Sequence, residues 1–179
     1  MRLISGAEAP SFVTEDATGK RVALADYRGR RVLLSFFRNA RCALCNLRVH
    51  HLIQRFDQFQ SAGLVVLAVF ESPAESLVQH VARQEVPFPL VADPTARLYE
   101  LYGVESSPEK VAAVVQQEPG WLKPLIAEAQ SIGYDLVPEP GSNFARLPAD
   151  FLIGPDGRIV TAFYSEAPGQ HLPWESLES

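Results

Sequence analysis

Two uninterrupted apolar segments constrain the fold of this chain more than any other feature of its sequence. The first, RVLLSFF, spans residues 31–37, and the second, LVVLAVF, spans residues 64–70. Apolar runs without polar alternation are typical of strands that are buried on both faces of a sheet. Strands that alternate with helices pair in parallel through right-handed crossovers, so the chain is predicted to form an α/β fold.

Helical patterns follow each of these predicted strands. Between the two strands, apolar residues recur at the spacing of one helix face, and Gly63 is predicted to end that helix. The face consists of Val49, Leu52, Ile53, Phe56 and Phe59. Residues 72–84 predict a second helix, with Ser72 as its N-cap, Pro73 in its first turn and Glu75 at the capping-box position.

The remaining segments predict a mixed sheet within a single domain of residues 1–179. Two short strands around residues 16–21 form an N-terminal β extension, and residues 149–164 form a hairpin that adds an antiparallel edge. A short strand and a short helix ending at Gly103 precede the least regular region, residues 104–142. Its five prolines predict broken helical segments, and by default this insert would cover one sheet face.

Composition excludes several classes of protein. A hydrophobic content of 47% and a charged content of 21% are ordinary for a soluble globular domain. The net charge of -5 argues against nucleic acid or an anionic membrane surface as partner. The N-terminal residues lack the pattern of a secretory signal, and residues 63–70 are too short to span a membrane. We therefore expect a cytoplasmic protein.

The chain contains two cysteines, Cys42 and Cys45, spaced C-x-x-C where the first apolar strand ends and a helix begins. The N-terminus of a helix favours a thiolate, and this placement lowers a cysteine pKa from about 8.5 to roughly 3.5–7.5. Arg38, Arg41 and Arg48 add positive charge that acts in the same direction. The pattern therefore predicts a reactive dithiol that can close to a disulfide.

Three other interpretations of the cysteine pair stay open. Two structural cysteines could meet at this spacing by chance, and a redox fold could keep the pair for binding alone. A zinc site would need two more ligands, and the chain has no second C-x-x-C and no H-x3-5-H pair. His50 and His51 are interpreted as part of a solvated helix face, and Trp121 and Trp174 as packing residues.

The segment FFRNARCALCNLRV, residues 36–49, together with ADFLIGPDGRI, residues 149–159, resembles the peroxiredoxin-like branch of the thioredoxin-fold superfamily, the alkyl hydroperoxide reductase and thiol-specific antioxidant group. The likeness runs from about Ala9 to Tyr164. It implies a thioredoxin-like fold, with a mixed central sheet flanked by helices. The chain departs from the usual site, F-Y-R-G-G-W-C-P-Y-C-N-L, at Arg41 and at the pair Ala43–Leu44.

The resemblance leaves the roles of the two sulfurs open. Aligned with the peroxiredoxin pattern P-x-x-x-T-x-x-C, Cys45 would attack peroxide, while Arg38 replaces the proline and Cys42 the threonine. Aligned with thioredoxins, Cys42 would be the nucleophile. Pro148 matches the cis-proline that faces the dithiol in thioredoxin-like folds, where many peroxiredoxins carry an arginine. Arg38 or Arg146 would then supply the missing cation.

Three functions follow from this reading. The first is a thiol-dependent peroxidase, an antioxidant enzyme that reduces hydrogen peroxide or organic hydroperoxides through the dithiol without a metal or organic cofactor. Thioredoxin, glutaredoxin or a small thiol would reduce the resulting disulfide. The second is a thiol–disulfide oxidoreductase acting on proteins. The third is a redox sensor or interaction module without catalysis. Dimerisation is expected by analogy with the family alone.

Overall fold

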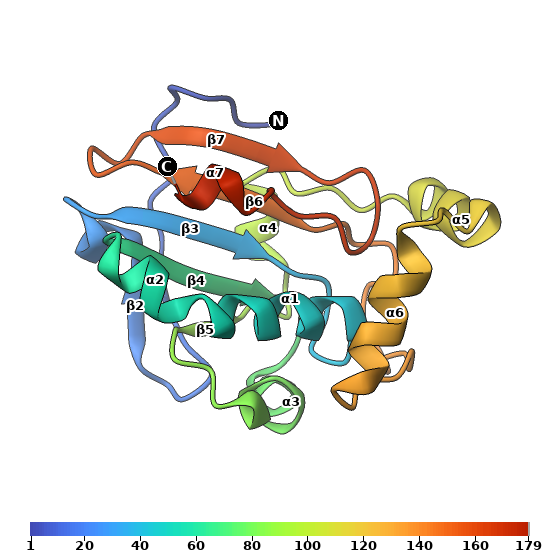
Figure 1. The fold of residues 1–179 in the computed structure, drawn as a ribbon. Coiled ribbons are helices and arrows are strands. Elements are labelled where there is room, and N and C mark those ends of the chain that lie inside the picture. The colour runs from blue at the N-terminus through green and yellow to red at the C-terminus, as the bar shows by residue number, and fades with distance from the viewer. Residues whose placement is uncertain (179) are drawn as a thin grey trace.

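A computed structural model describes residues 1–178, which form a five-stranded sheet with helices on both faces (Figure 1). The strands are β1 (Val13–Glu15), β2 (Arg21–Ala23), β3 (Arg31–Phe36), β4 (Leu64–Phe70), β5 (Leu90–Ala92), β6 (Ala149–Ile153) and β7 (Ile159–Tyr164). The α-helices are α1 (Ala43–Gln54), α2 (Phe56–Ser61), α3 (Ala74–His80), α4 (Arg97–Leu101), α5 (Pro108–Gln117), α6 (Leu122–Ser131) and α7 (Glu175–Glu178). Within these residues, no helix combines the length and apolar character needed to cross a membrane.

The central sheet is mixed, as the sequence predicts. Its strand order is β5-β4-β3-β6-β7, in which β3 pairs in parallel with β4 and β4 with β5. The hairpin β6–β7 adds to β3 in the antiparallel direction, and β1 and β2 form a separate two-stranded sheet. The predicted parallel centre, antiparallel edge and N-terminal β extension are therefore confirmed.

Both faces of the central strands are buried, which explains the uninterrupted apolar sequence of β3. Leu33 and the following Phe37 face the layer that contains α1, whereas Leu34 and Phe36 face the opposite layer, where Tyr99 packs. Figure 1 shows α1 in front of the sheet and α4 behind it. Because side chains alternate along a strand, a strand covered on both sides has no face turned to solvent, and Ser35, the polar residue inside β3, is buried and donates to Asp150 of β6.

The predicted crossover helix is interrupted. The structure ends α1 at Gln54 and starts α2 at Phe56, because Arg55 leaves the helical conformation with φ −100° and ψ 3°. The apolar face continues across the break, since Leu52 and Phe59 are both fully buried. The periodicity of the sequence predicts which side chains are buried, but it does not predict the break in the helix at Arg55.

The predicted N-cap role of Ser72 is wrong. Helix α3 begins after Pro73 and has no side-chain cap. The Ser72 hydroxyl instead donates to Oε2 of Glu139, 2.5 Å away, and accepts a hydrogen bond from the backbone N–H of Ala40 at 2.9 Å. The oxygen that would accept an N–H of the helix as a cap is thus taken by Ala40, and the O–H makes a charge-assisted hydrogen bond to a buried carboxylate. Ser72 therefore joins the loop after β3 to the insert; Ser76 also donates to Glu139.

The insert lies beyond the carboxyl ends of the strands rather than over a sheet face, which corrects the default expectation for residues 104–142 (Figure 1). Helix α6 packs against the first turns of α1 through a small cluster of buried side chains. These are Ala43, Leu47, Ala129 and Tyr134. The insert is consequently placed beside the start of α1, where the cysteines are.

We expect the loss of unfolding free energy when a valine is replaced by alanine to depend on how deeply that valine is buried. Val69→Ala removes two methyl groups from a fully buried position in β4 and should lower the free energy of unfolding by about 2 kcal/mol or more. Val160→Ala, at a position in β7 that is 52% exposed, should cost less than about 1 kcal/mol. Urea unfolding of both variants measures the difference. Equal losses would contradict the burial assigned to β4.

Candidate functional site: a dithiol at the start of α1

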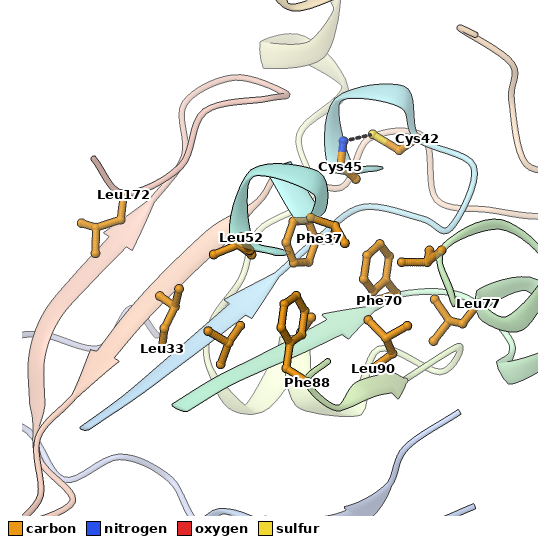
Figure 2. Packing of buried hydrophobic residues seen from close by; sticks show 14 of the residues in the cluster. Leu33, Phe37, Cys42, Cys45, Leu52, Phe70, Leu77, Phe88, Leu90 and Leu172 are labelled. Atoms are coloured by element: carbon orange, nitrogen blue, oxygen red, sulfur yellow. Dashed lines mark hydrogen bonds between the residues drawn. The ribbon is translucent and has the colours of Figure 1, made fainter. Parts of the chain in front are cut away.

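The two cysteines lie at the start of α1, just after the loop that follows β3. Cys42 is the N-cap residue of the helix, and its Sγ accepts a hydrogen bond from the backbone N–H of Cys45, 3.3 Å away (Figure 2). Asn46 fixes the turn, because its side-chain amide donates to the backbone oxygens of Ala40 at 2.8 Å and of Cys42 at 3.1 Å. The cysteines are not joined in a disulfide. Cys42 therefore occupies the place that a serine or aspartate cap usually takes.

The surroundings separate the two thiols in acidity. A hydrogen bond from the Cys45 thiol lowers the pKa of Cys42 to about 6; burial opposes this shift, while the charge of Arg38 and the backbone N–H groups of Cys45 and Leu44 add to it. The pKa of Cys45 is raised well above its usual value by burial, then by its hydrogen bond to Cys42 and the negative charge there. Cys42 is therefore the thiolate at neutral pH, and Cys45 holds the proton.

Arg38 connects the dithiol to the segment that precedes β6. Its backbone N–H approaches Sγ of Cys45 at 3.5 Å. Its guanidinium donates from Nε to the backbone oxygen of Arg146 at 3.1 Å and from Nη2 to that of Phe144 at 2.6 Å. The same group lies over the Phe144 ring, 5.2 Å from its centroid. These contacts hold the positive charge beside the sulfurs.

The other two arginines predicted to crowd the dithiol act elsewhere. Arg48 lies over the ring of Trp174, 3.4 Å from its centroid, and its charge acts on Asp150. The charge of Arg41 contributes to a lowered pKa of His80, for which burial is the larger cause. Arg41 precedes the helix, and Arg48 is held by the ring of Trp174 and the backbone oxygen of Leu172, so closeness in sequence does not place these charges at the sulfurs.

A cavity of about 400 Å³ gives access to Cys42. The Cys42 residue is 8% exposed and lines this cavity, whereas Cys45 is 2% exposed and does not. Arg38, Asn39, Ala43, Leu44 and Pro168 complete one side of it, and the insert with its following loop supplies Val111, Val114, Val115, Leu122, Ile126, Leu136, Val137, Pro138, Ser142 and Phe144. Leu136 and Phe144 are 60% and 61% exposed, so the cavity has an apolar mouth at the surface.

Pro148 is near the dithiol loop, but the expected cis bond is absent: no peptide bond among residues 1–178 is cis. Pro148 directly precedes Ala149, which pairs with Phe36 at the end of β3. Arg146 is not free to supply a cation, because it is buried and paired with Glu71, with Nε 2.6 Å from Oε2. Of the two candidate cations, Arg38 alone lines the cavity with Cys42.

The histidines after the site face away from the sulfurs. His50 lies beside Gln54, and His51 pairs with Glu128 of α6, with Nε2 2.7 Å from Oε1. Within the described part of the chain, no three side chains of the metal-ligating types cluster as a cation site would need.

Two groups at this end of the molecule were not singled out from the sequence. Glu139 anchors the insert, and Asp150 is fully buried in β6, where its Oδ1 accepts from the Ser35 hydroxyl at 2.5 Å. A charged residue inside the apolar run ADFLI was the available signal for Asp150, because buried carboxylates are rare without partners. The apolar lining from the insert carried no comparable signal.

Comparison with known proteins assigns this arrangement to one family. The family model described as AhpC/TSA matches residues 5–162. A putative peroxiredoxin of Mycobacterium tuberculosis is 33% identical over 115 residues, which cover 64% of this chain and 73% of that protein. The thiol-disulfide oxidoreductase ResA of Bacillus subtilis is 31% identical over 104 residues, or 58% of each chain.

A solved structure supports the fold. The crystal structure of the peroxidoxin BcpB from Mycobacterium tuberculosis superposes with a TM-score of 0.67 at 15% identity, covering 94% of this chain and 90% of that chain. The thioredoxin-like fold predicted from the sequence is thereby confirmed.

The pKa difference between the thiols predicts a pH profile for alkylation. Iodoacetamide should modify Cys42 with a midpoint near the pKa of about 6, fast above it and slow below it, because the thiolate is the reactive form. Cys45→Ala removes the S–H donor and should move the midpoint upward, whereas Cys45→Ser keeps an O–H donor and should move it less. Peptide mapping by mass spectrometry measures the rate at each pH. A midpoint near pH 8.5, or adducts mainly on Cys45, would contradict the assignment.

Proposed function

The chain belongs to the AhpC/TSA family, and on that premise we propose that it is a thiol-dependent peroxidase whose attacking sulfur is Cys42. The enzyme is an oxidoreductase that transfers two electrons from a thiol reductant to a peroxide. One observation carries the choice of sulfur: Cys42 has the lowered pKa and lines the cavity, while Cys45 has the raised pKa and is sealed. A peroxide can react only with a sulfur that is both ionised and accessible.

The first step breaks the peroxide O–O bond. The Cys42 thiolate attacks one peroxide oxygen and becomes a sulfenic acid, and the second oxygen leaves as an alkoxide or hydroxide that takes a proton from water. Negative charge grows on the leaving oxygen in this step. The Arg38 guanidinium is held beside the cavity by the backbone oxygens of residues 144 and 146 and is the cation suited to stabilise that charge.

The second step closes the dithiol. The Cys45 thiol attacks the sulfenic sulfur of Cys42, which releases water and forms a disulfide. The pair needs little movement, because the cysteines share the first turn of α1 and the backbone N–H of Cys45 already lies 3.3 Å from Sγ of Cys42. An external thiol reductant then supplies two electrons and two protons to restore both thiols. The disulfide is thus an obligatory intermediate, and a single chain contains both sulfurs.

The lining of the cavity supports organic hydroperoxides as the preferred substrates. The insert turns valine, leucine and isoleucine side chains toward the space in front of Cys42, and Phe144 and Leu136 continue this apolar surface to the exterior. An alkyl or aryl group would bury apolar area there, whereas hydrogen peroxide gains nothing from such walls.

The partners follow from the chemistry. The proposed reductant is thioredoxin, glutaredoxin or a small thiol, and the proposed location is the cytoplasm, where such thiols are kept reduced. Dimer formation stays a prediction.

A second candidate is disulfide exchange with protein substrates. The exposed, acidic sulfur is the first cysteine of C-x-x-C, as in the thioredoxin alignment, and ResA matches part of the chain. A mixed disulfide on Cys42 would then replace the sulfenic acid.

Mass spectrometry after one equivalent of cumene hydroperoxide tests the roles of the sulfurs. The wild type should lose about 2 Da as the disulfide forms, and Cys45→Ser should gain about 16 Da at Cys42 as the sulfenic acid accumulates. Cys42→Ser should oxidise far more slowly, because its remaining thiol is protonated and sealed. If Cys42→Ser instead gains oxygen at Cys45 as fast as the other variant does at Cys42, the attacking sulfur is Cys45.

Turnover assays separate the two candidate functions. With the same thioredoxin system as reductant, and after subtraction of the rate measured without this protein, we expect the wild type to consume cumene hydroperoxide at least about tenfold faster than it reduces insulin disulfides. Cys42→Ser should abolish both activities. Faster reduction of insulin would favour the second candidate, and no turnover of either substrate would leave neither function standing.

A further inference from the structure

Leu44, which lines the cavity that contains Cys42, also lines a second cavity, of about 600 Å³. Helix α1, helix α6 and the segment before α7 enclose it. Its lining residues are Leu44, Leu47, Arg48, His51, Trp121, Leu125, Phe163, Gly169, Gln170, His171, Leu172, Pro173 and Trp174. Most of these side chains are apolar or aromatic, and no step of the proposed peroxidase reaction uses them.

Two polar atoms in this lining are buried without a hydrogen-bond partner: Nε2 of His171 and Nε of Arg48. The His171 side chain is only 3% exposed, so water at the surface does not satisfy it. A buried polar atom without a partner is costly, and such atoms are few in folded proteins. Two such atoms on residues that line one cavity indicate a binding site for a polar group.

The orientation of His171 is fixed from behind. Its Nδ1 lies 3.1 Å from Oδ2 of Asp150, which also accepts from the backbone N–H of Leu172 at 2.7 Å. Burial raises the pKa of Asp150, but the charge and hydrogen bond of His171, the charge of Arg48 and the Ser35 hydroxyl outweigh it and lower that pKa to about 2. The ionised carboxylate therefore accepts a hydrogen bond from Nδ1–H, which leaves Nε2, on the opposite edge of the ring, as the nitrogen without a partner.

Arg48 is held just as firmly. Its guanidinium lies 3.4 Å from the centroid of the Trp174 ring, and Nη2 donates to the backbone oxygen of Leu172 at 2.7 Å. Burial lowers the pKa of Arg48 to about 10, so the group stays a cation at neutral pH. Arg55 lies over the same Trp174 ring at 4.2 Å and adds a second positive charge.

The lining of the cavity carries positive charge without a matching carboxylate. It contains the guanidinium of Arg48, and none of its residues is an aspartate or a glutamate. An incoming group with negative charge would offset this excess and would accept a hydrogen bond from Nε–H of Arg48.

We propose that this cavity binds a small organic carboxylate with an apolar body, at a site separate from the dithiol. One carboxylate oxygen accepts a hydrogen bond from Nε–H of Arg48, and the other accepts one from Nε2–H of His171, whose ring takes up a proton from water as the carboxylate binds. The body packs among Trp121, Leu125 and Phe163. A volume of about 600 Å³ suits a molecule of this size.

Tryptophan fluorescence tests the proposal, because both tryptophans of the chain line this cavity. Titration of the reduced protein with sodium octanoate should give a saturable change in emission, and calorimetry should give the same affinity. The neutral analogue 1-octanol, with the same chain length, should bind at least about tenfold more weakly, since it lacks the charge that Arg48 recognises. Equal binding of octanol, or no saturable change with octanoate, would overturn the proposal.

Variants identify the atoms involved. His171→Asn keeps an amide that can donate to Asp150 but removes the nitrogen that faces the cavity, and should weaken octanoate at least about tenfold. Arg48→Lys keeps the charge but loses Nε and should also weaken it. His80→Asn, on α3 outside this cavity, should bind like the wild type. Far-UV circular dichroism checks folding, and if His171→Asn does not fold, Arg48→Lys decides. Unchanged affinity in the folded variants would overturn the assignment.

Discussion

The chemistry of this protein depends on the hydrogen bonds that the Cys42 sulfur accepts at the first turn of α1. The backbone N–H of Cys45 and the Cys45 thiol both approach that sulfur, at the end of a helix where unpaired N–H groups leave a positive potential. The hydrogen bond from the Cys45 thiol thus acts on both cysteines. It lowers the pKa of Cys42, which accepts it, and raises the pKa of Cys45, which donates it. The sheet makes the arrangement rigid, because β3 is buried on both faces and delivers the chain to the same point.

The insert turns this helix end into a site. The carboxylate of Glu139 receives hydrogen bonds from Ser72 and Ser76, and α6 packs on α1, so the insert is fixed at the point where the sulfurs lie. Its apolar residues leave Cys42 accessible only through a cavity. Such walls make the surroundings of the sulfur less polar and strengthen the electrostatic effect of Arg38 on the thiolate, because charges interact more strongly where the surroundings are less polar.

Three arginines, Arg38, Arg48 and Arg146, make different interactions. Arg38 lies beside the dithiol, and Arg48 lines the second cavity. Arg146 is buried and paired with Glu71, and it also donates to the backbone oxygen of Val104. Leu44 lines both cavities, and a side chain at Gly169 would collide with it, since a Cβ there would lie 2.7 Å from Leu44 Cδ1. Leu44 and the adjacent residues Pro168 and Gly169 therefore lie between the two cavities.

The sequence by itself determined the order of strands and helices, the mixed sheet and the place of the C-x-x-C pair, because hydrophobic periodicity and turn residues act over short stretches of chain. Only the tertiary structure decided which sulfur is accessible, since that depends on contacts with residues some hundred positions away, such as Phe144. It also decided that Ser72 bonds to Glu139 instead of capping a helix, and that Asp150 meets His171. Such pairings join segments distant in sequence, and no local pattern encodes the distance between them.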